Sequence, residues 1–259
     1  MQSPLKAYKR ANGAWGLRNQ VLILPMHSAL SSTARAIADS SDGAVAISHD
    51  WSGEKDNDLA RIIFTLSGYA SNPNIFATVF LSIGSPEEEQ IIKGAQALGL
   101  TRFTNLLLPE IGSMEKLQQQ ALSIANGYVK EANSEVRVDA PWSAIVLGLE
   151  CGGSDALSGI TANPALGVAS DRLVELGASS VLGETTEILG AEHLLAARAI
   201  DPAVEATPGG VAVRVRAVPA VVMNRGVQRL RAVADVMCQD AHRVDHILPG
   251  IGDLLGRAT

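Results

Sequence analysis

The sequence predicts an α/β protein with parallel sheets in Rossmann-like lobes and helices on both faces of each sheet. Two observations predict this class. Apolar runs of strand length alternate with stretches whose apolar residues recur at helical spacing. The same alternation starts again after a polar stretch near residue 139. Strands that alternate with helices favour parallel sheets with right-handed crossovers, and the restart indicates a second lobe.

The first predicted lobe, residues 1–138, contains four expected strands, each followed by an expected helix. The strands are expected at residues 20–25, 44–48, 75–83 and 103–108. The helices are expected at residues 31–39, 56–69, 86–98 and 112–132. In the third helix, Ser85 is suited to cap the N-terminus and Pro86 to occupy the first turn.

The second predicted lobe, residues 139–200, follows a linker at residues 133–141. Its strands are expected at residues 144–149 and 179–183, and its helices at residues 167–176 and 187–199. Residues 201–259 form an atypical tail that is rich in Val, Ala and Arg and contains neither Lys nor an aromatic residue. An altered reading frame in GC-rich DNA and a divergent ending both account for this tail. Exposed apolar surface there favours self-association, so we expect a homo-oligomer.

Composition excludes several classes of protein. The 259 residues are 47% hydrophobic, which is enough for a sizeable core. A net charge of −6 argues against a nucleic-acid-binding surface. No apolar run has the roughly 18 residues that a membrane helix needs, and residues 1–10 lack the apolar core of a signal peptide. Two cysteines, Cys151 and Cys238, imply no disulfide framework. We therefore expect a cytoplasmic enzyme or binding protein.

The densest polar segment, residues 151–163, directly follows an expected strand and reads CGGSDALSGITAN. Ligands of parallel sheets bind at the carboxyl ends of the strands. Two glycines allow backbone N–H groups to approach an anion, and several side chains add donors and acceptors. These residues are Gly152, Gly153, Ser154, Asp155, Ser158, Thr161 and Asn163. The simpler alternative is a glycine turn followed by helix caps.

A second polar segment, residues 184–193, follows the next expected strand and reads ETTEILGAEH. Its Glu184, Glu187, Glu192 and His193 are suited to bind a divalent metal or to act as acid and base. Glu187 and Glu192 are five residues apart in an expected helix, so they face different directions. The alternative is that acidic residues stabilise the first turn of a helix. We expect both polar segments to line one pocket.

A third segment, residues 8–19, precedes the first expected strand and reads YKRANGAWGLRN. Arg10 and Arg18 can clamp a carboxylate with their planar guanidinium groups. The alternative is a surface turn with Asn12 and Gly13 at its apex.

Three further side chains and one absent motif complete the sequence evidence. His27 and His49 each follow a strand, and Cys151 is a candidate soft ligand rather than a nucleophile. No G-x-G-x-x-G follows the first strand, so no nucleotide cofactor is expected.

Together the three segments resemble the altronate and galactarate dehydratase family, which includes the large subunit of sulfolactate sulfo-lyase. Residues 8–25 are similar to the family's opening G-Y-x-R-x-D-G-R-x-G-x-R-N motif and first strand. Residues 151–171 are close to its central signature, and residues 182–199 resemble its E-T-x-E-I-x-G-A-E-H segment. The resemblance covers roughly residues 6–200 in the correct order.

The resemblance implies a lyase that acts on hydroxy acids with a divalent metal, often Fe²⁺. Dehydration would give a 2-keto-3-deoxy acid, and related β-elimination would expel another group. The catalytic candidates are Asp155, Glu184, Glu187 and His193. The substrate-binding candidates are Arg10, Arg18, Asn19, Gly152, Gly153, Ser154, Ser158, Thr161, Asn163 and Thr185. The metal candidates are Cys151, His49 and Glu192.

Three departures from the family pattern limit how much of the family's activity and site can be inferred for this chain. Cysteines of the H-G-x-G-C-G and G-L-G-C-E motifs are replaced in residues 49–53 and 82–86. The family's small N-terminal domain is missing, so we expect a small partner subunit. The family's C-terminal motifs are absent beyond residue 201. The leading interpretation is a large subunit or core domain of a lyase, and the alternative is a non-catalytic member that binds a small acid or a partner.

Overall fold

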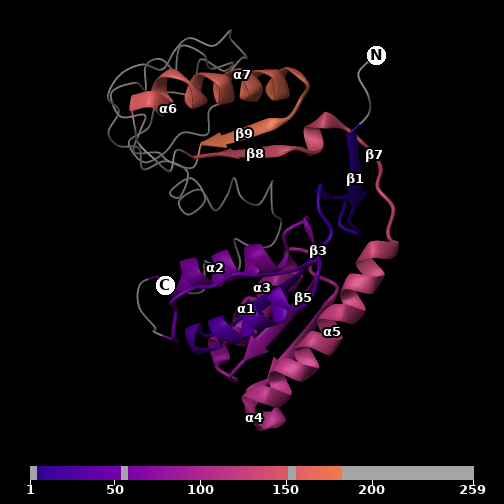
Figure 1. Ribbon diagram of the computed structural model, residues 1–259, viewed down its shortest axis with the longest axis vertical. Helices are drawn as coiled ribbons and strands as arrows, with labels where there is room; N and C mark the ends of the chain where they lie inside the picture. Colours follow the sequence, from indigo (N-terminus) through magenta and orange to yellow (C-terminus); the bar gives the residue numbers. More distant parts are fainter. Residues whose placement is uncertain (1–4, 54–57, 151–155, 183–259) are drawn as a thin grey trace. The chain divides into compact units, whose positions relative to one another are not determined.

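The computed structural model describes residues 5–53, 58–150 and 156–182, which fall into two compact units (Figure 1). The first unit contains the described residues up to Ala140, and the second begins at Pro141. The predicted tail and the helix expected at residues 187–199 lie outside the described residues.

A four-stranded parallel sheet forms the centre of the first unit. Its strands are β3 (Gln20–Pro25), β4 (Ala44–Ala46), β5 (Ile75–Ser82) and β6 (Phe103–Leu107). The spatial order is β4-β3-β5-β6, and every neighbouring pair is parallel. The α/β class is thus confirmed. The chain moves outward from β3 to β4 and then returns past β3 to β5, so the order reverses between β3 and β5. The Rossmann-like description is not confirmed beyond a parallel sheet between helical layers.

Helices cover both faces of this sheet, as predicted. They are η1 (Ser28–Leu30), α1 (Ser31–Asp39), α2 (Leu59–Ala70), α3 (Pro86–Ala97), α4 (Leu108–Ile111) and α5 (Met114–Ser134). Alternate residues of β3 belong to two separate cores. Val21 and Ile23 pack with α1 and α5, whereas Leu22 and Leu24 pack with α2 and α3. A strand buried on both faces reads as a continuous apolar run, which is why the sequence identified it.

The start of α3 forms as its sequence predicted. Ser85 is the N-cap, its hydroxyl accepts from the Glu88 N–H, and Pro86 is the first helical residue. Glu88 completes a capping box, because its carboxylate accepts from the Ser85 N–H (3.1 Å).

A second sheet was missed by sequence reasoning. The strands β1 (Leu5–Lys9), β2 (Trp15–Gly16) and β7 (Val138–Ala140) form an antiparallel sheet in the order β2-β1-β7. The stretch predicted as a linker at residues 133–141 therefore contains the last two residues of α5 and the strand β7. Such short strands carry little periodic signal, and one of the two partners of β1, the strand β7, lies more than a hundred residues away along the chain.

The second unit contains a parallel pair of strands, β8 (Val146–Leu149) and β9 (Ser179–Leu182). Between them the chain forms α6 (Ala156–Ile160) and α7 (Ala162–Glu175), and η2 (Trp142–Ala144) precedes β8. The expected helix at residues 167–176 starts five residues earlier, at Ala162. Pro164 is the third residue of α7, where a missing N–H costs no helical hydrogen bond.

Candidate functional site

The structure describes seven of the predicted site residues. They are Arg10, Arg18, Asn19, His49, Ser158, Thr161 and Asn163. The other ten lie outside the described residues: Cys151, Gly152, Gly153, Ser154, Asp155, Glu184, Thr185, Glu187, Glu192 and His193. The prediction that residues 151–163 and 184–193 share one pocket therefore stays a prediction.

The Arg10 side chain forms hydrogen bonds and an ion pair with other residues of the protein, at the amino ends of the strands. Its Nε donates to the carbonyl oxygen of Pro73 (2.7 Å), and its Nη2 donates to the carbonyl oxygen of Arg18 (3.1 Å). Its Nη1 lies 3.5 Å from a carboxylate oxygen of Glu135. Burial lowers the pKa of Arg10, and the Glu135 carboxylate opposes that shift. The guanidinium remains charged at neutral pH.

Glu135, directly after α5, is the shared partner of several polar side chains around Arg10. Its second carboxylate oxygen accepts from Arg102 (3.1 Å). The amide of Asn19 donates to Glu135 (3.4 Å) and to the carbonyl oxygen of Ala132 (2.7 Å). One carboxylate thus joins the segments before β3, after β1, before β6 and after α5. No local pattern in the sequence predicts this role of Glu135.

The segment 8–19 is a hairpin and corner that packs on the loop before β5. Gly13 has a φ of +86° in the turn between β1 and β2, as the alternative interpretation of this segment expected. A Cβ on Gly16 would overlap the carbonyl group of Pro73, so only glycine fits there. The Asn74 side chain accepts from the Leu17 and Arg18 N–H groups (2.8 and 3.0 Å). The Arg18 side chain is exposed, and no partner for its guanidinium is found in the described part of the chain.

The predicted ligand His49 lies at the opposite end of the same sheet. Its Nε2 lies 2.7 Å from the carbonyl oxygen of Pro25, the last residue of β3. A carbonyl only accepts, so Nε2 carries the proton and Nδ1 has a free lone pair. Nδ1 is buried and has no hydrogen-bond partner among the described residues. Because β3 has six residues, roughly 20 Å of strand separates His49 from the Arg10 cluster.

His27 contrasts with His49, because both of its ring nitrogens are used. Its Nδ1 accepts from the Ala29 N–H (3.1 Å), so Nε2 donates to the carbonyl oxygen of Ser52 (2.9 Å). His27 therefore joins the start of η1 to the loop after His49. This is a structural role.

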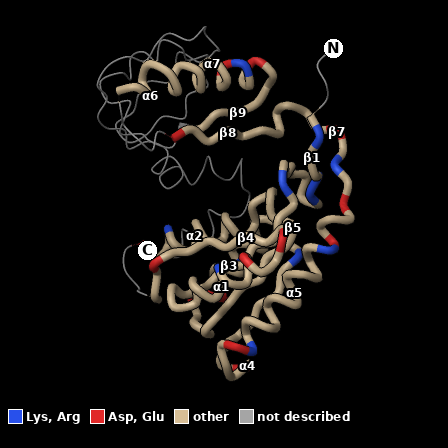
Figure 2. Tube along the Cα trace, in the orientation of Figure 1, with Lys and Arg blue, Asp and Glu red and all other residues tan. Residues whose placement is uncertain are grey.

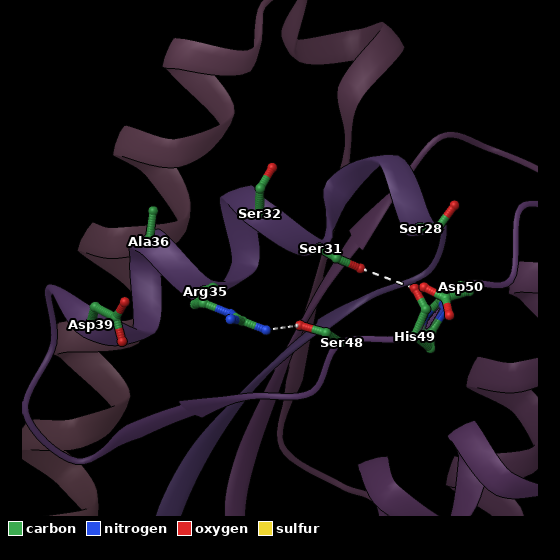
Figure 3. A pocket seen from close by; sticks show the side chains of 9 residues that line it. All are labelled: Ser28, Ser31, Ser32, Arg35, Ala36, Asp39, Ser48, His49 and Asp50. Atoms are coloured by element: carbon green, nitrogen blue, oxygen red, sulfur yellow. Dashed lines mark hydrogen bonds between the residues drawn. The ribbon is translucent and has the colours of Figure 1, made fainter.

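A hollow of about 440 Å³ lies beside His49 at the carboxyl edge of β4 (Figure 3). Arg35 of α1 reaches across it and donates to the hydroxyl of Ser48 (3.0 Å). The hydroxyl of Ser31 donates to the carbonyl oxygen of His49 (3.3 Å). The remaining lining residues are Ser28, Ser32, Ala36, Asp39 and Asp50. Serine hydroxyls, one guanidinium and two carboxylates supply the polar part of this wall.

A neighbouring hollow of about 530 Å³ shares His49 and Asp50 but has a different wall. Trp51, Ile62 and Leu66 make it more apolar. Its cation, Arg61, is already paired with Asp58 (3.1 Å). Sequence reasoning identified neither hollow, because the residues that line them belong to separate segments.

A third potential binding position lies at the carboxyl edge of the sheet, and a side chain of the protein itself occupies it. The Glu88 carboxylate accepts from the backbone N–H groups of Ile83 (3.0 Å), Gly84 (2.7 Å) and Ser85 (3.1 Å). Three converging N–H groups beside a helix N-terminus form an anion-binding nest. Here the anion is the protein's own buried side chain, so this nest serves the fold.

Three predicted residues lie in the described part of the second unit. The Thr161 hydroxyl donates to the carbonyl oxygen of Leu157 (2.8 Å), which ties the end of α6 to the start of α7. Ser158 lies on α6 and Asn163 on α7, and both make interactions with other groups. Their predicted contacts with substrate stay predictions.

A complete metal site does not arise from the described residues. Within residues 5–53, 58–150 and 156–182, no three His, Cys, Asp or Glu side chains are grouped to hold an ion. His49 is the described member of the predicted ligand set, and its unpartnered Nδ1 suits a single metal bond. In the same part of the chain, no helix is long and apolar enough to cross a membrane.

Comparison with known families accounts for most of the chain. Residues 7–133 match the second domain of D-galactarate dehydratase/altronate hydrolase, and residues 142–228 match the C-terminal D-galactarate/altronate dehydratase domain. The chain belongs to the altronate and galactarate dehydratase family. The resemblance inferred from the sequence is therefore confirmed. The second match also extends beyond residue 200, where the resemblance was expected to end.

Individual relatives agree with this assignment. The (2R)-sulfolactate sulfo-lyase subunit beta of Chromohalobacter salexigens is 32% identical over 192 residues, 74% of this chain and 49% of the relative. The altronate dehydratase of Escherichia coli is 33% identical over 208 residues, 74% of this chain and 41% of the relative. The galactarate dehydratase of the same organism is 35% identical over 148 residues, 54% of this chain and 28% of the relative. This chain thus spans less than half the length of these relatives.

Proposed function

We propose that the chain is the core of a lyase that eliminates a β-substituent from a hydroxy acid, with water as the leaving group in a dehydration. The observation that carries the proposal is that two successive domains of a dehydratase family match this chain in order. Relatives that eliminate water and a relative that is a sulfo-lyase share one chemical logic. A base removes the proton α to the carboxylate, and the β-group leaves with the bonding electrons.

In a dehydration, the β-hydroxyl accepts a proton and departs as water, and the resulting enol tautomerises to a 2-keto-3-deoxy acid. Asp155, Glu184, Glu187 and His193 are the proposed proton-transfer groups. The proposed substrate contacts in the second unit are Gly152, Gly153, Ser154, Ser158, Thr161, Asn163 and Thr185. Arg18 is a better candidate for the substrate carboxylate than Arg10, because the Arg10 donors already face Pro73, Arg18 and Glu135. Asn19 is likewise bound to the end of α5.

We also propose a divalent cation, with Fe²⁺ as the first candidate and His49 as its candidate ligand in the first unit. Such an ion would increase the acidity of the α-proton. The described residues do not by themselves complete its coordination, so no reaction step is assigned to it. A partner subunit is proposed because one relative is named as the β subunit of its enzyme.

The test is a product assay with altronate, galactarate and sulfolactate as separate substrates. Each reaction is run with and without Fe²⁺, and with and without the partner subunit of the Chromohalobacter enzyme. Formation of a 2-keto acid or of sulfite supports the proposal. Saturable binding of an acid without turnover in any condition supports the alternative, a non-catalytic member of the family.

A further inference from the structure

We propose that Asn74 is a positioning residue for Arg18, because its side-chain oxygen fixes the backbone from which the Arg18 guanidinium reaches the carboxylate of the acid. This inference rests on the proposed function, in which Arg18 binds that carboxylate. It adds a residue that is 56 positions away in the sequence and belongs to none of the segments that carry the family resemblance.

The backbone of Leu17 and Arg18 is held by side chains from three other segments. Both N–H groups donate to the Oδ1 atom of Asn74 (2.8 and 3.0 Å). The carbonyl oxygen of Leu17 accepts from Nη2 of Arg137 (2.9 Å), and that of Arg18 accepts from Nη2 of Arg10 (3.1 Å). All four backbone polar groups of this corner are therefore bonded, although the corner lies outside any helix or strand.

The sheet fixes Asn74 itself. Asn74 directly precedes β5, and its carbonyl oxygen accepts from the N–H of Gln20, the first residue of β3 (3.1 Å). Its own N–H donates to the side-chain oxygen of Asn72 (2.9 Å). On the same loop, Pro73 packs directly on Gly16, where a Cβ would overlap the Pro73 carbonyl group. The two central strands of the sheet thus set the position of the Asn74 oxygen, and that oxygen sets the position of the corner.

Stability alone does not require these hydrogen bonds. Leu17 and Arg18 are exposed, so water would satisfy the same backbone groups, and each bond contributes little net stability. The bonds instead remove conformational freedom from the corner. The Arg18 guanidinium has no partner in the described part of the chain, so it is available for an anion. A guanidinium on a preorganised backbone loses less entropy when it binds a planar carboxylate, which increases affinity.

The first test is amide hydrogen exchange of Leu17 and Arg18 in the full chain, followed by NMR. We expect Asn74→Ala to accelerate exchange of both amides at least about fivefold, because both lose their acceptor. Asn12→Ala is the matched control. The Asn12 oxygen accepts from the Ala14 N–H in the same hairpin (3.1 Å), so its removal should leave exchange at the corner unchanged.

The second test is the kinetics of each variant with the acid, among altronate, galactarate and sulfolactate, that gives product. Arg18→Ala should raise KM about thirtyfold, and Asn74→Ala about fivefold with little change in kcat. In the Arg18→Ala background, Asn74→Ala should change KM less than about twofold, because it acts only through that guanidinium. Arg137→Met releases the Leu17 carbonyl and should raise KM about threefold, whereas Asn12→Ala should leave KM unchanged.

Additive effects of Asn74→Ala and Arg18→Ala on KM would overturn the proposal, and so would an unchanged KM in a variant whose corner exchanges faster. If Asn74→Ala does not fold, Arg137→Met and its combination with Arg18→Ala provide the same test.

If no acid gives product, calorimetry with altronate replaces the kinetics. Binding that depends on Asn74 and Arg18 would then refute the proposed lyase and leave the positioning role standing, whereas the absence of saturable binding at millimolar altronate would overturn the positioning role as well. Product formation with a KM that is insensitive to Asn74→Ala and Arg137→Met would refute the positioning role and leave the lyase standing.

Discussion

The two ends of the sheet in the first unit use polar residues differently. At the amino end, Arg10, Arg102 and Glu135 direct their polar groups at one another and at backbone carbonyls, and the Asn19 amide nitrogen donates to Ala132 and Glu135 while its buried Oδ1 has no partner among the described residues. At the carboxyl end, His49 keeps a buried nitrogen without a partner, and the Arg35 guanidinium is not neutralised by any described residue. Polar groups that are satisfied internally hold a fold together, whereas unsatisfied groups remain free for a ligand.

Charged residues of both signs lie along the strands β1 and β7 (Figure 2). Lys6 and Asp139 pair across the β1–β7 ladder (2.5 Å) with side chains 55% and 67% exposed. Arg10 and Glu135 are more protected, at 14% and 32%. Since screening by water weakens exposed pairs, these two ion pairs should contribute unequally to stability.

The largest expected effect is on activity, from His49→Gln. The glutamine amide can still donate to the Pro25 carbonyl, but it lacks the free Nδ1 lone pair. We expect a loss of at least about a hundredfold in kcat/KM, or about 2.7 kcal/mol, with a change in unfolding free energy below about 1 kcal/mol. Metal retention, measured by mass spectrometry, should fall as well. An active His49→Gln variant would remove the functional distinction between the two ends.

The next largest effect is on stability, from Glu135→Ala. Arg10 and Arg102 would face each other without a counter-charge, and Asn19 would lose an acceptor. Fully buried pairs cost about 3 to 5 kcal/mol to break, and exposed pairs about 1 or less, so we expect about 2 kcal/mol here. Urea denaturation measures it. A cost below about 0.5 kcal/mol would mean that the cluster does not hold the amino end together.

A smaller effect on stability is expected from Glu88→Gln at the carboxyl end. The variant keeps one acceptor but loses the charge that three N–H groups share. We expect a cost of about 1 to 1.5 kcal/mol and unchanged acid binding. Urea denaturation of this variant measures the stability cost, and calorimetry on the same variant measures acid binding. If acid binding falls in a folded variant, the nest belongs to the ligand site rather than to the fold.

The smallest effect is expected from Asp139→Ala. It removes an exposed pair on the antiparallel sheet of β1, β2 and β7 and should change the unfolding free energy by about 0.5 kcal/mol or less. It is the control for Glu135→Ala in the same denaturation series. Equal losses in the two variants would show that burial does not distinguish these ion pairs.

The sequence by itself determined the strands of the four-stranded parallel sheet, the main helices that cover it and the family of the chain. β3, α1 and the Ser85 cap formed at the predicted residues, because apolar periodicity and capping act over a few neighbouring residues. The family followed from three ordered motifs. These signals are local, so they can be identified without coordinates.

Only the tertiary structure decided which polar residues are satisfied. Nothing near Arg10 in the sequence indicates Glu135, which is 125 residues away, or the carbonyl of Pro73. The free Nδ1 of His49 follows from the Pro25 carbonyl, 24 residues earlier, and Arg35 and Ser48 meet only because β4 pairs with β3. A motif identifies residue types, but whether a side chain is available depends on neighbours that only the fold brings together.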